Sequence, residues 1–311
     1  MMNRLAVKFL VFVASLIVIM VIIGLFLLSD YTENSIKEST QNQIELNIKK
    51  INENLDLSNS LYLEHVKTGM ASLKYFCNME GAPTLENENL QFGKTIINNN
   101  FTIVDRVKKI AGGTATIFVK SGNSFIRIST NVINDKGERA IGTELDPNGK
   151  AYKSITSGVS FYGLVTILGN PYITGYEPIK DNNGNIIGIF YTGYPLSTLT
   201  ELGQKIEETK LLDNGFVALV NDKNKIEFLS STITKEEAEK VISTKTSAKF
   251  SNWDVQSLIY NEWGYSIVAA YPEDDINSRV NVVKTGLITA SVSFGFLIII
   301  IIYYLVSKII L

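Results

Sequence analysis

"TATIFVKSGNSFIRISTNV", from Thr114 to Val132, decides the fold class of this chain. Two runs rich in β-branched and aromatic residues predict β-strands at Thr114–Val119 and Ser124–Val132, joined by the turn "KSGN". The second strand carries Arg127, one of only five arginines in the chain, close in sequence to the hydroxyl of Thr130. A scarce cation in a scaffold strand makes Arg127 a candidate functional residue.

Strand-turn-strand patterns recur along the rest of the chain. Strands are predicted near Tyr172–Ile179 and Ile186–Tyr194 around "NNGN", because Asn and Gly accept the positive φ of a hairpin turn. Further hairpins are predicted over Gly215–Ser231 and Asp254–Pro272, and "SFYGLVTILG" predicts one more strand. Consecutive hairpins make antiparallel sheet with helices outside it, so the fold class is α+β.

A long helix is predicted over residues 31 to 75. It contains no proline, and apolar residues recur mostly at steps of three and four, the stripe of an amphipathic helix. Two interpretations stay open: the stripe packs along one globular core, or its membrane-proximal part also forms a parallel dimer seam. The stripe comprises Ile44, Ile48, Ile51, Leu55, Tyr62, Val66, Met70 and Leu73.

Shorter helices are predicted between the strands. After a loop at Met79–Gly93 we expect a helix over Phe92–Ile110, and another over Lys150–Thr156. A helix at Leu196–Thr209 separates the first set of strands from the second. In "TKEEAEKVIST", a threonine followed three residues later by glutamate indicates a capping box.

Two uncharged apolar runs lie near the ends of the chain. Phe9–Ser29 has 21 residues and Thr285–Ser307 has 23, and each suffices for a helix across a hydrocarbon core of about 30 Å. The alternative for the first run is a signal peptide, but it is longer than a typical signal core and no A-x-A-like site follows. We therefore expect two transmembrane helices.

The charges predict the orientation in the membrane. Arg4 and Lys8 precede the first run, so the positive-inside rule puts both termini in the cytoplasm and residues 30–284 outside. That outer segment holds 26 basic residues against 31 acidic ones, a net charge of −5, which excludes a basic surface for nucleic acid. The single cysteine, Cys77, cannot form a disulfide within the chain.

Residues suited to catalysis are scarce. The one histidine, His65, lies on the predicted long helix, and no nucleophile elbow, phosphate-binding loop or metal-spaced Cys/His set occurs. Glu144 and Asp146 lie in a predicted loop and are expected to be solvated. We expect no enzyme, no cofactor and no metal.

Residues suited to binding a small anion gather between positions 125 and 180. Arginine holds a carboxylate through two parallel hydrogen bonds, and tyrosine adds a hydroxyl to an apolar wall. The alternative is that Arg127 forms a structural ion pair while the tyrosines only pack. The candidate ligand residues are Arg127, Thr130, Arg139, Tyr152, Tyr162, Tyr172 and Tyr176.

The stretches "GGTATIFVKSGNSFIRISTNVINDKGERAIGTELD" and "AYKSITSGVSFYGLVTILGNPYITGYEPIKDNNGNIIGIFYTGYPL" resemble a known family. They are similar to the extracellular Cache sensor domains of bacterial methyl-accepting chemotaxis receptors, in the fused Cache 3–Cache 2 form. The resemblance covers roughly residues 35 to 280 and is densest between Gly112 and Pro195.

The resemblance implies a PAS-like antiparallel sheet behind a long N-terminal helix, in a dimeric receptor. It also implies a pocket in the membrane-distal lobe, with Arg127 on a pocket-facing strand, Thr130 nearby and the loop of Arg139 crossing above. The expected ligand is a small extracellular molecule, most simply a short organic acid.

The expected segments follow from the same resemblance. They are a first membrane helix (1–29), a stalk helix (30–75), a distal ligand-binding lobe (76–200), a smaller proximal lobe with the exit helix (201–284) and a second membrane helix (285–311). A HAMP linker and a signalling domain usually follow in that family, whereas this sequence stops at Leu311. Chemotaxis, kinase and cyclase outputs, or a membrane-anchored binding module without an output, therefore stay open.

Overall fold

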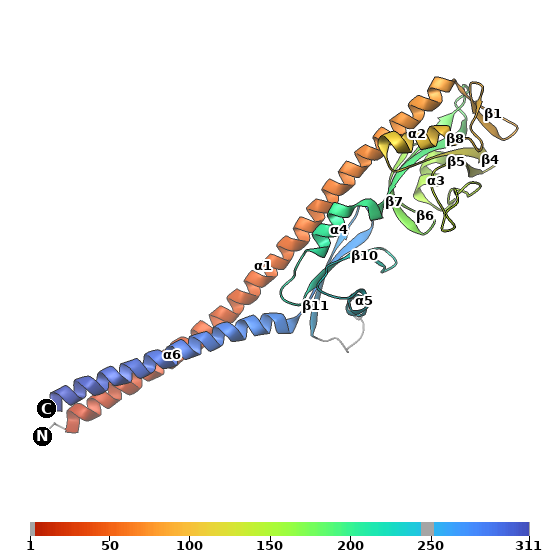
Figure 1. The fold of residues 1–311 in the computed structure, drawn as a ribbon. Helices are drawn as coiled ribbons and strands as arrows, with labels where there is room; N and C mark the ends of the chain where they lie inside the picture. Colours follow the sequence, from red (N-terminus) through yellow and green to blue (C-terminus); the bar gives the residue numbers. More distant parts are fainter. Residues whose placement is uncertain (1–3, 244–251, 311) are drawn as a thin grey trace. The chain divides into compact units, whose positions relative to one another are not determined.

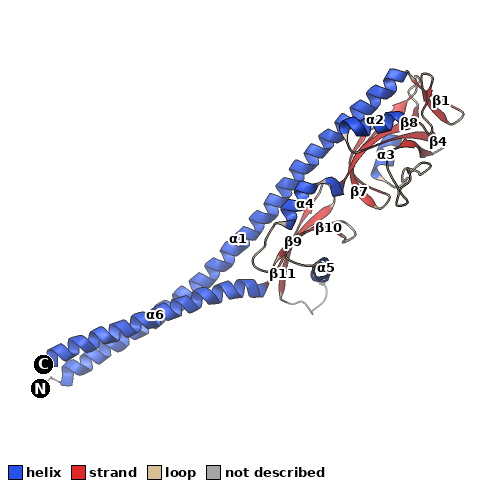
Figure 2. Cartoon of the chain, viewed as in Figure 1, coloured by secondary structure: helices blue, strands red, loops and turns tan. Residues whose placement is uncertain are grey.

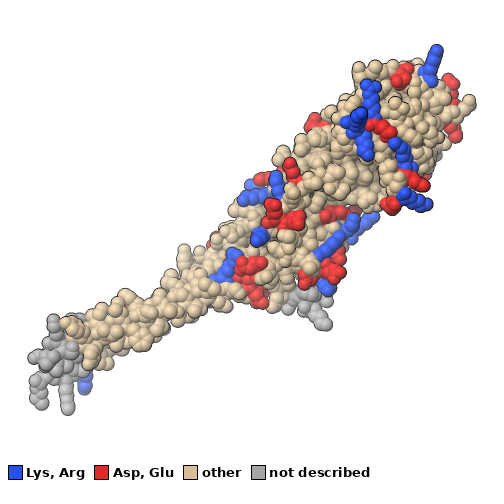
Figure 3. All heavy atoms as spheres, viewed as in Figure 1, with Lys and Arg blue, Asp and Glu red and all other residues tan. Residues whose placement is uncertain are grey.

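A computed structural model describes residues 4–243 and 252–310 and confirms the α+β fold with a long N-terminal helix (Figure 1). Helix α1 runs unbroken from Arg4 to Glu80, and helix α6 runs from Glu273 to Ile310. Each contains a segment long and apolar enough to cross a membrane. On the face drawn in Figure 3, these segments show almost no charged side chain.

The described residues group into two compact units. One comprises Met1–Lys50, Glu207–Leu258 and Ile267–Leu311; the other comprises Ile51–Ile206 and Ile259–Ser266. Helix α1 contributes residues to both units, because it passes through the boundary at Lys50 without a break.

The second unit is built on a five-stranded antiparallel sheet, whose strands are drawn in red in Figure 2. The strand order is β5-β4-β8-β7-β6. This sheet confirms the two hairpins and the additional strand predicted from the sequence. The strands are β4 (Thr114–Ser121), β5 (Ser124–Thr130), β6 (Phe161–Ile167), β7 (Asn170–Lys180) and β8 (Ile186–Pro195).

A β-bulge interrupts the pairing of β4 with β5. Ile117 lies opposite Ser129, whereas the next residue, Phe118, lies opposite Arg127, so the register shifts by one residue at this point. Two residues three apart in a regular strand lie on opposite faces, but one extra residue reverses this alternation. The bulge therefore brings Arg127 and Thr130 to the same face of the sheet.

The two faces of this sheet carry separate cores. One face packs against α1 and α2 (Thr102–Ala111) through a cluster that includes Met70, Val104 and Ile117. The other face packs against α3 (Lys150–Thr156), which has the predicted bounds, through a cluster that includes Phe118 and Ile155. The face toward α3 is the one that carries Arg127, because Phe118 lies directly opposite it.

The prediction of a helix from Phe92 is wrong in its start, and so is the loop predicted before it. Residues 83–96 form a small sheet of β1 (Pro83–Glu86), β2 (Asn89–Phe92) and β3 (Thr95–Ile96). The following asparagines hold the turn: Asn98 Oδ1 accepts from the amide of Leu90 at 3.0 Å, and Asn100 Oδ1 accepts from the amide of Thr102 at 3.1 Å. Side-chain acceptors of this kind compete with helical hydrogen bonds, so α2 begins only at Thr102.

A second sheet has the order β10-β9-β12-β11 and confirms the last two predicted hairpins. The predicted helix at Leu196–Thr209 is split into a 3-10 turn and α4. The capping box is confirmed: the amide of Glu237 donates to Thr234 Oγ1 at 3.4 Å and the amide of Thr234 donates to Glu237 Oε2 at 3.2 Å. The elements are η1 (Leu196–Thr198), α4 (Thr200–Glu207), β9 (Phe216–Val220), β10 (Ile226–Leu229), α5 (Lys235–Ser243), β11 (Trp253–Tyr260) and β12 (Tyr265–Pro272).

Candidate functional site

Arg127 lies in β5, the edge strand of the five-stranded sheet, and its side chain is buried with 4% exposed. The loop after β5 folds back along this edge. The amide of Arg127 donates to the carbonyl of Thr143, and the amide of Gly142 donates to the carbonyl of Arg127, both at 2.9 Å. These two bonds close the edge of the sheet and explain why a strand at the border is buried.

The guanidinium of Arg127 has no acidic partner among the residues that the structure describes. It lies over the ring of Phe118, with Cζ 4.9 Å from the ring centroid, and Nη1 donates to Thr143 Oγ1. Its Nε is buried and makes no hydrogen bond in the described structure. A buried charge without a counter-charge carries a large desolvation cost, so this cation is unusual for a purely structural residue.

Burial lowers the pKa of Arg127, while Tyr176, Tyr191 and Tyr172 act in the opposite direction. The ordinary value of arginine is so high that the group stays charged at neutral pH. The surrounding tyrosines stay protonated, because burial raises the pKa of Tyr172 and of Tyr176. The site is therefore a fixed cation faced by neutral hydroxyls.

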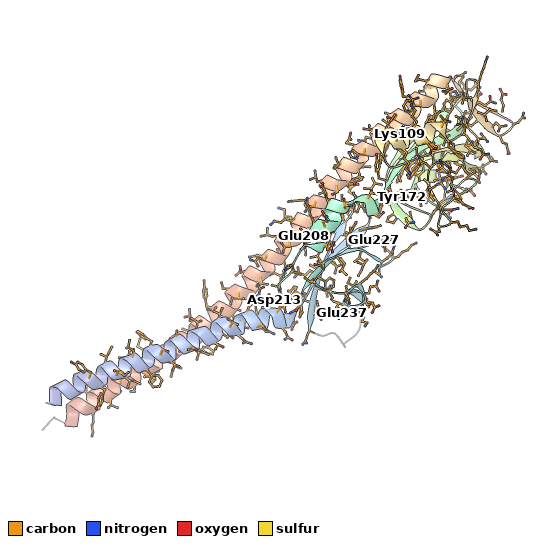
Figure 4. All side chains as sticks on the ribbon, in the orientation of Figure 1. Lys109, Tyr172, Glu208, Asp213, Glu227 and Glu237 are labelled. Carbon is orange, nitrogen blue, oxygen red and sulfur yellow. The ribbon has the colours of Figure 1, made fainter. Side chains whose placement is uncertain are left out.

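The tyrosines come from β7 and β8 on the same face of the sheet. Tyr176 lies opposite Tyr191, with ring centroids 5.0 Å apart, and Tyr172 lies opposite Pro195. Tyr191 shares a hydrogen bond of 3.1 Å with Thr114 Oγ1. No described residue hydrogen-bonds the hydroxyl of Tyr172, which Figure 4 labels, or that of Tyr176. Two uncommitted hydroxyls beside an unpaired guanidinium suit a carboxylate ligand.

Thr130 and Tyr152 lie on the same side of the sheet but are engaged within the fold. The hydroxyl of Thr130 lies 2.6 Å from that of Thr116 and accepts a hydrogen bond from the amide of Val132 at 3.0 Å. Tyr152 belongs to α3, packs against the core that contains Phe118, and donates to the carbonyl of Asn123 at 2.5 Å. Both frame the face that carries Arg127.

Arg139 does not join Arg127, because an acidic residue of α2 occupies its guanidinium. Nη1 and Nη2 donate to the two carboxylate oxygens of Asp105, both at 2.8 Å, and Nη1 also donates to the carbonyl of Thr130 at 2.7 Å. This fork-to-fork pair attaches the loop after β5 to α2. A structural ion pair is the alternative role that the sequence leaves open for Arg127. Such a pair is observed at Arg139 instead.

Tyr162 does not join Arg127 either, because it lies on the face toward α1. Its neighbour Phe161 is paired with Tyr176, so alternation along β6 turns Tyr162 to the opposite side. There its hydroxyl donates to Glu177 Oε1 at 2.7 Å, and Lys74 of α1 donates to Glu177 Oε2 at 2.6 Å. These contacts attach the sheet to α1.

Sequence reasoning missed Thr143 and Tyr191 as neighbours of Arg127. A signal for Tyr191 exists: Tyr176 and Tyr191 are equally distant from the centre of the "NNGN" turn, and hairpin pairing brings such residues opposite each other. Thr143 lies in an irregular loop, whose path no local pattern of the sequence predicts.

Three other features of the described residues concern metal ligands, hollows and the cysteine. Within residues 4–243 and 252–310 no group of three or more His, Cys, Asp or Glu could hold a metal ion. A hollow of about 240 Å³ between the apolar segments of α1 and α6 is lined almost wholly by aliphatic side chains, and another of about 640 Å³ lies along α5. Cys77 is buried as a free thiol, and burial raises its pKa to about 12, which keeps the thiol protonated at neutral pH.

Comparison with known families gives one match that covers most of the chain. Residues 29–262 match the Cache 3/Cache 2 fusion domain. No curated protein matches the sequence.

Several solved structures are similar in fold. The sensory domain of the Campylobacter jejuni chemoreceptor Tlp3 (CcmL) with isoleucine bound is 18% identical; the likeness covers 79% of this chain and 98% of that one, with a TM-score of 0.46. The ligand-binding domain of Mlp24 with asparagine is 12% identical over 81% and 98%, with a TM-score of 0.43. The sensor domain of the V. cholerae histidine kinase DctB is 11% identical over 78% and 98%, with a TM-score of 0.39.

Proposed function

The chain belongs to the Cache 3/Cache 2 fusion domain family, and from this premise we propose that it is the sensory region of a transmembrane chemoreceptor. Residues 30–284 lie outside the membrane and bind a small carboxylate at Arg127. The observation that carries this proposal is the buried guanidinium of Arg127, which has no acidic partner among the described residues.

The free edge of that guanidinium has the right geometry for the ligand. Nη1 is taken by Thr143, while Nε and Nη2 make no hydrogen bond with the described residues. The N–H groups of Nε and Nη2 point in the same direction, which is the fork that holds both oxygens of a carboxylate. The hydroxyls of Tyr172 and Tyr176 supply further donors, and Thr130 and Tyr152 shape the wall.

The membrane part of the proposal rests on the two long helices. Helix α1 is continuous from its apolar segment to the residues that pack against the sheet, and we propose that it carries a change of packing at the sheet toward the membrane. We place both termini in the cytoplasm and two copies side by side as a homodimer. The type of output, whether chemotaxis, kinase or cyclase, would be set by the cytoplasmic part of the receptor.

The full chain in lipid nanodiscs tests the proposal. A panel of small carboxylates is screened by thermal shift, because a ligand that binds only the folded state raises the melting temperature. We expect at least one carboxylate to do so in the wild-type chain and to lose the effect in Arg127→Gln. A panel without a single hit, or a hit unchanged in Arg127→Gln, contradicts a carboxylate site at Arg127.

A further inference from the structure

We infer that the Arg127 site selects acids that carry a single carboxylate and no ammonium group. This inference rests on the proposed function, because it concerns the ligand class of the same site. It follows from where the acidic and basic side chains around the site point.

An α-ammonium group needs an acidic or carbonyl acceptor when it is buried, since an unsatisfied charge is costly. The acid next to Thr143 in sequence is Glu144. The Oε1 of Glu144 accepts from the hydroxyl of Ser124, and alternation along β5 puts Ser124, three residues before Arg127, on the opposite face of the sheet. Glu144 therefore cannot bind an ammonium group held at Arg127.

The remaining acids nearby are engaged elsewhere. Asp105 is held by both nitrogens of Arg139. Glu177 lies on the opposite face of the sheet, bonded to Lys74, and exposed Asp146 accepts from the amide of Asn148 at 2.9 Å. Among the described residues no carboxylate acts on the charge of Arg127, so an ammonium group there would have no counter-charge and would lie beside the like charge of Arg127 itself.

The basic side chains around the site limit the ligand to one carboxylate. Arg127 is the only cation of the described residues that lies among Tyr172, Tyr176 and Tyr191. Arg139 is bound to Asp105, and Lys150 at the start of α3 is exposed. A second carboxylate would be buried beside tyrosine hydroxyls without a counter-charge, whereas a 2-hydroxyl group could exchange hydrogen bonds with them.

Matched ligands separate these classes. The full chain in nanodiscs is titrated by calorimetry with two sets of equal carbon skeleton: propionate, lactate and alanine, then 3-methylbutanoate, 2-hydroxy-3-methylbutanoate and valine. Malate tests the effect of a second carboxylate on the lactate skeleton. We expect each amino acid to bind at least about tenfold more weakly than its hydroxy-acid partner, and malate at least about tenfold more weakly than lactate.

The outcomes distinguish a wrong ligand class from a wrong binding site. An amino acid that binds as tightly as its hydroxy-acid partner, and loses binding in Arg127→Gln, overturns the ligand class but leaves the carboxylate site in place. The same holds for malate binding as tightly as lactate. If no acid of either set binds, or if binding is unchanged in Arg127→Gln with a wild-type melting temperature, the Arg127 site itself is wrong and the inference fails with it.

Discussion

Tyr176 and Glu177 are consecutive residues of β7 whose side chains lie on opposite faces of the five-stranded sheet. The ring of Tyr176 contacts Tyr191 in the core toward α3, whereas the carboxylate of Glu177 is bonded to Lys74 of α1. The next strand repeats the arrangement: Tyr191 faces the candidate site, and Thr192 donates to the carbonyl of Val66 in α1 at 2.9 Å. Two strands thus connect the candidate site directly to helix α1, whose N-terminal part is long and apolar enough to cross a membrane.

Replacing Arg127 with methionine separates ligand binding from stability. We expect carboxylate affinity to fall by about 1.5–3 kcal/mol, the range for a hydrogen bond to a charged group. The unliganded protein should be as stable as wild type or more so, because the substitution removes a buried charge without a counter-charge. Calorimetry and thermal melting measure the two effects.

Arg139→Gln is the matched control for Arg127→Gln, the variant used in the binding tests. It breaks the bidentate pair with Asp105, so we expect a stability loss of about 1 kcal/mol with ligand affinity unchanged. A loss of affinity in Arg139→Gln at wild-type stability would place Arg139 in the binding site after all.

The tyrosine hydroxyls are tested by Tyr176→Phe and Tyr172→Phe. Neither hydroxyl bonds a described residue, so each variant should melt like wild type, while ligand affinity falls by about 0.5–1.5 kcal/mol. Tyr162→Phe is the control on the other face. It removes a hydrogen bond to Glu177, so it should lower stability and leave the ligand affinity at its wild-type value. The opposite pattern would contradict the assignment of the two faces.

Thr192→Val tests the contact between β8 and α1. Valine keeps the shape of threonine but cannot donate to the carbonyl of Val66, so we expect a loss of about 0.5–1.5 kcal/mol in the free energy of unfolding. Hydrogen exchange of the α1 amides around Val66 should also accelerate. Unchanged exchange there, together with unchanged stability, would show that this bond does not hold α1 to the sheet.

Gly113→Ala tests how closely the backbone of Gly113, just before β4, approaches the backbone of Gly193 in β8. Gly113 has φ near +63°, and an added Cβ would lie 2.7 Å from the carbonyl oxygen of Gly193. Gly122→Ala has a similar φ of +58° but open space, so it isolates the backbone cost of about 1–2 kcal/mol. We expect Gly113→Ala to cost clearly more than Gly122→Ala in denaturant unfolding. Equal losses in the free energy of unfolding would mean that the ends of β4 and β8 separate at little energetic cost.

The acid sensitivity of the contact between the sheet and α1 follows from Glu177. Burial raises the pKa of Glu177, but hydrogen bonds from Lys74 and Tyr162 outweigh it and leave the value below its usual 4.5. A carboxyl whose pKa is lowered on folding stabilises the protein above its unfolded pKa, and this contribution is lost as pH falls through the folded value. We therefore expect the melting temperature of wild type to fall more steeply below pH 4.5 than that of Glu177→Gln. Parallel curves would show that Glu177 contributes nothing to acid sensitivity.

Local patterns of the sequence determined most of the fold. Apolar runs of helical length predicted the two helices that could cross a membrane, and strand-like runs around turns predicted the hairpins, since both signals are contained within a short window. Arg127 was recognised as a candidate because a scarce cation stands in a buried strand. The small sheet before α2 was missed, because its strands are short and the asparagines that end it act through their side chains.

Only the tertiary structure decided which candidates lie together. The bulge between β4 and β5 moves Thr130 to the face of Arg127, and the register of β6 against β7 turns Tyr162 away from it. Asp105 lies 34 residues before Arg139 in the chain, yet the loop after β5 brings the two into contact and leaves Arg127 as the unpaired cation. The sheet face on which a side chain lies, and the acid with which an arginine pairs, both depend on contacts between distant segments. A local pattern therefore indicates the residue types of a site but not which of them share a face.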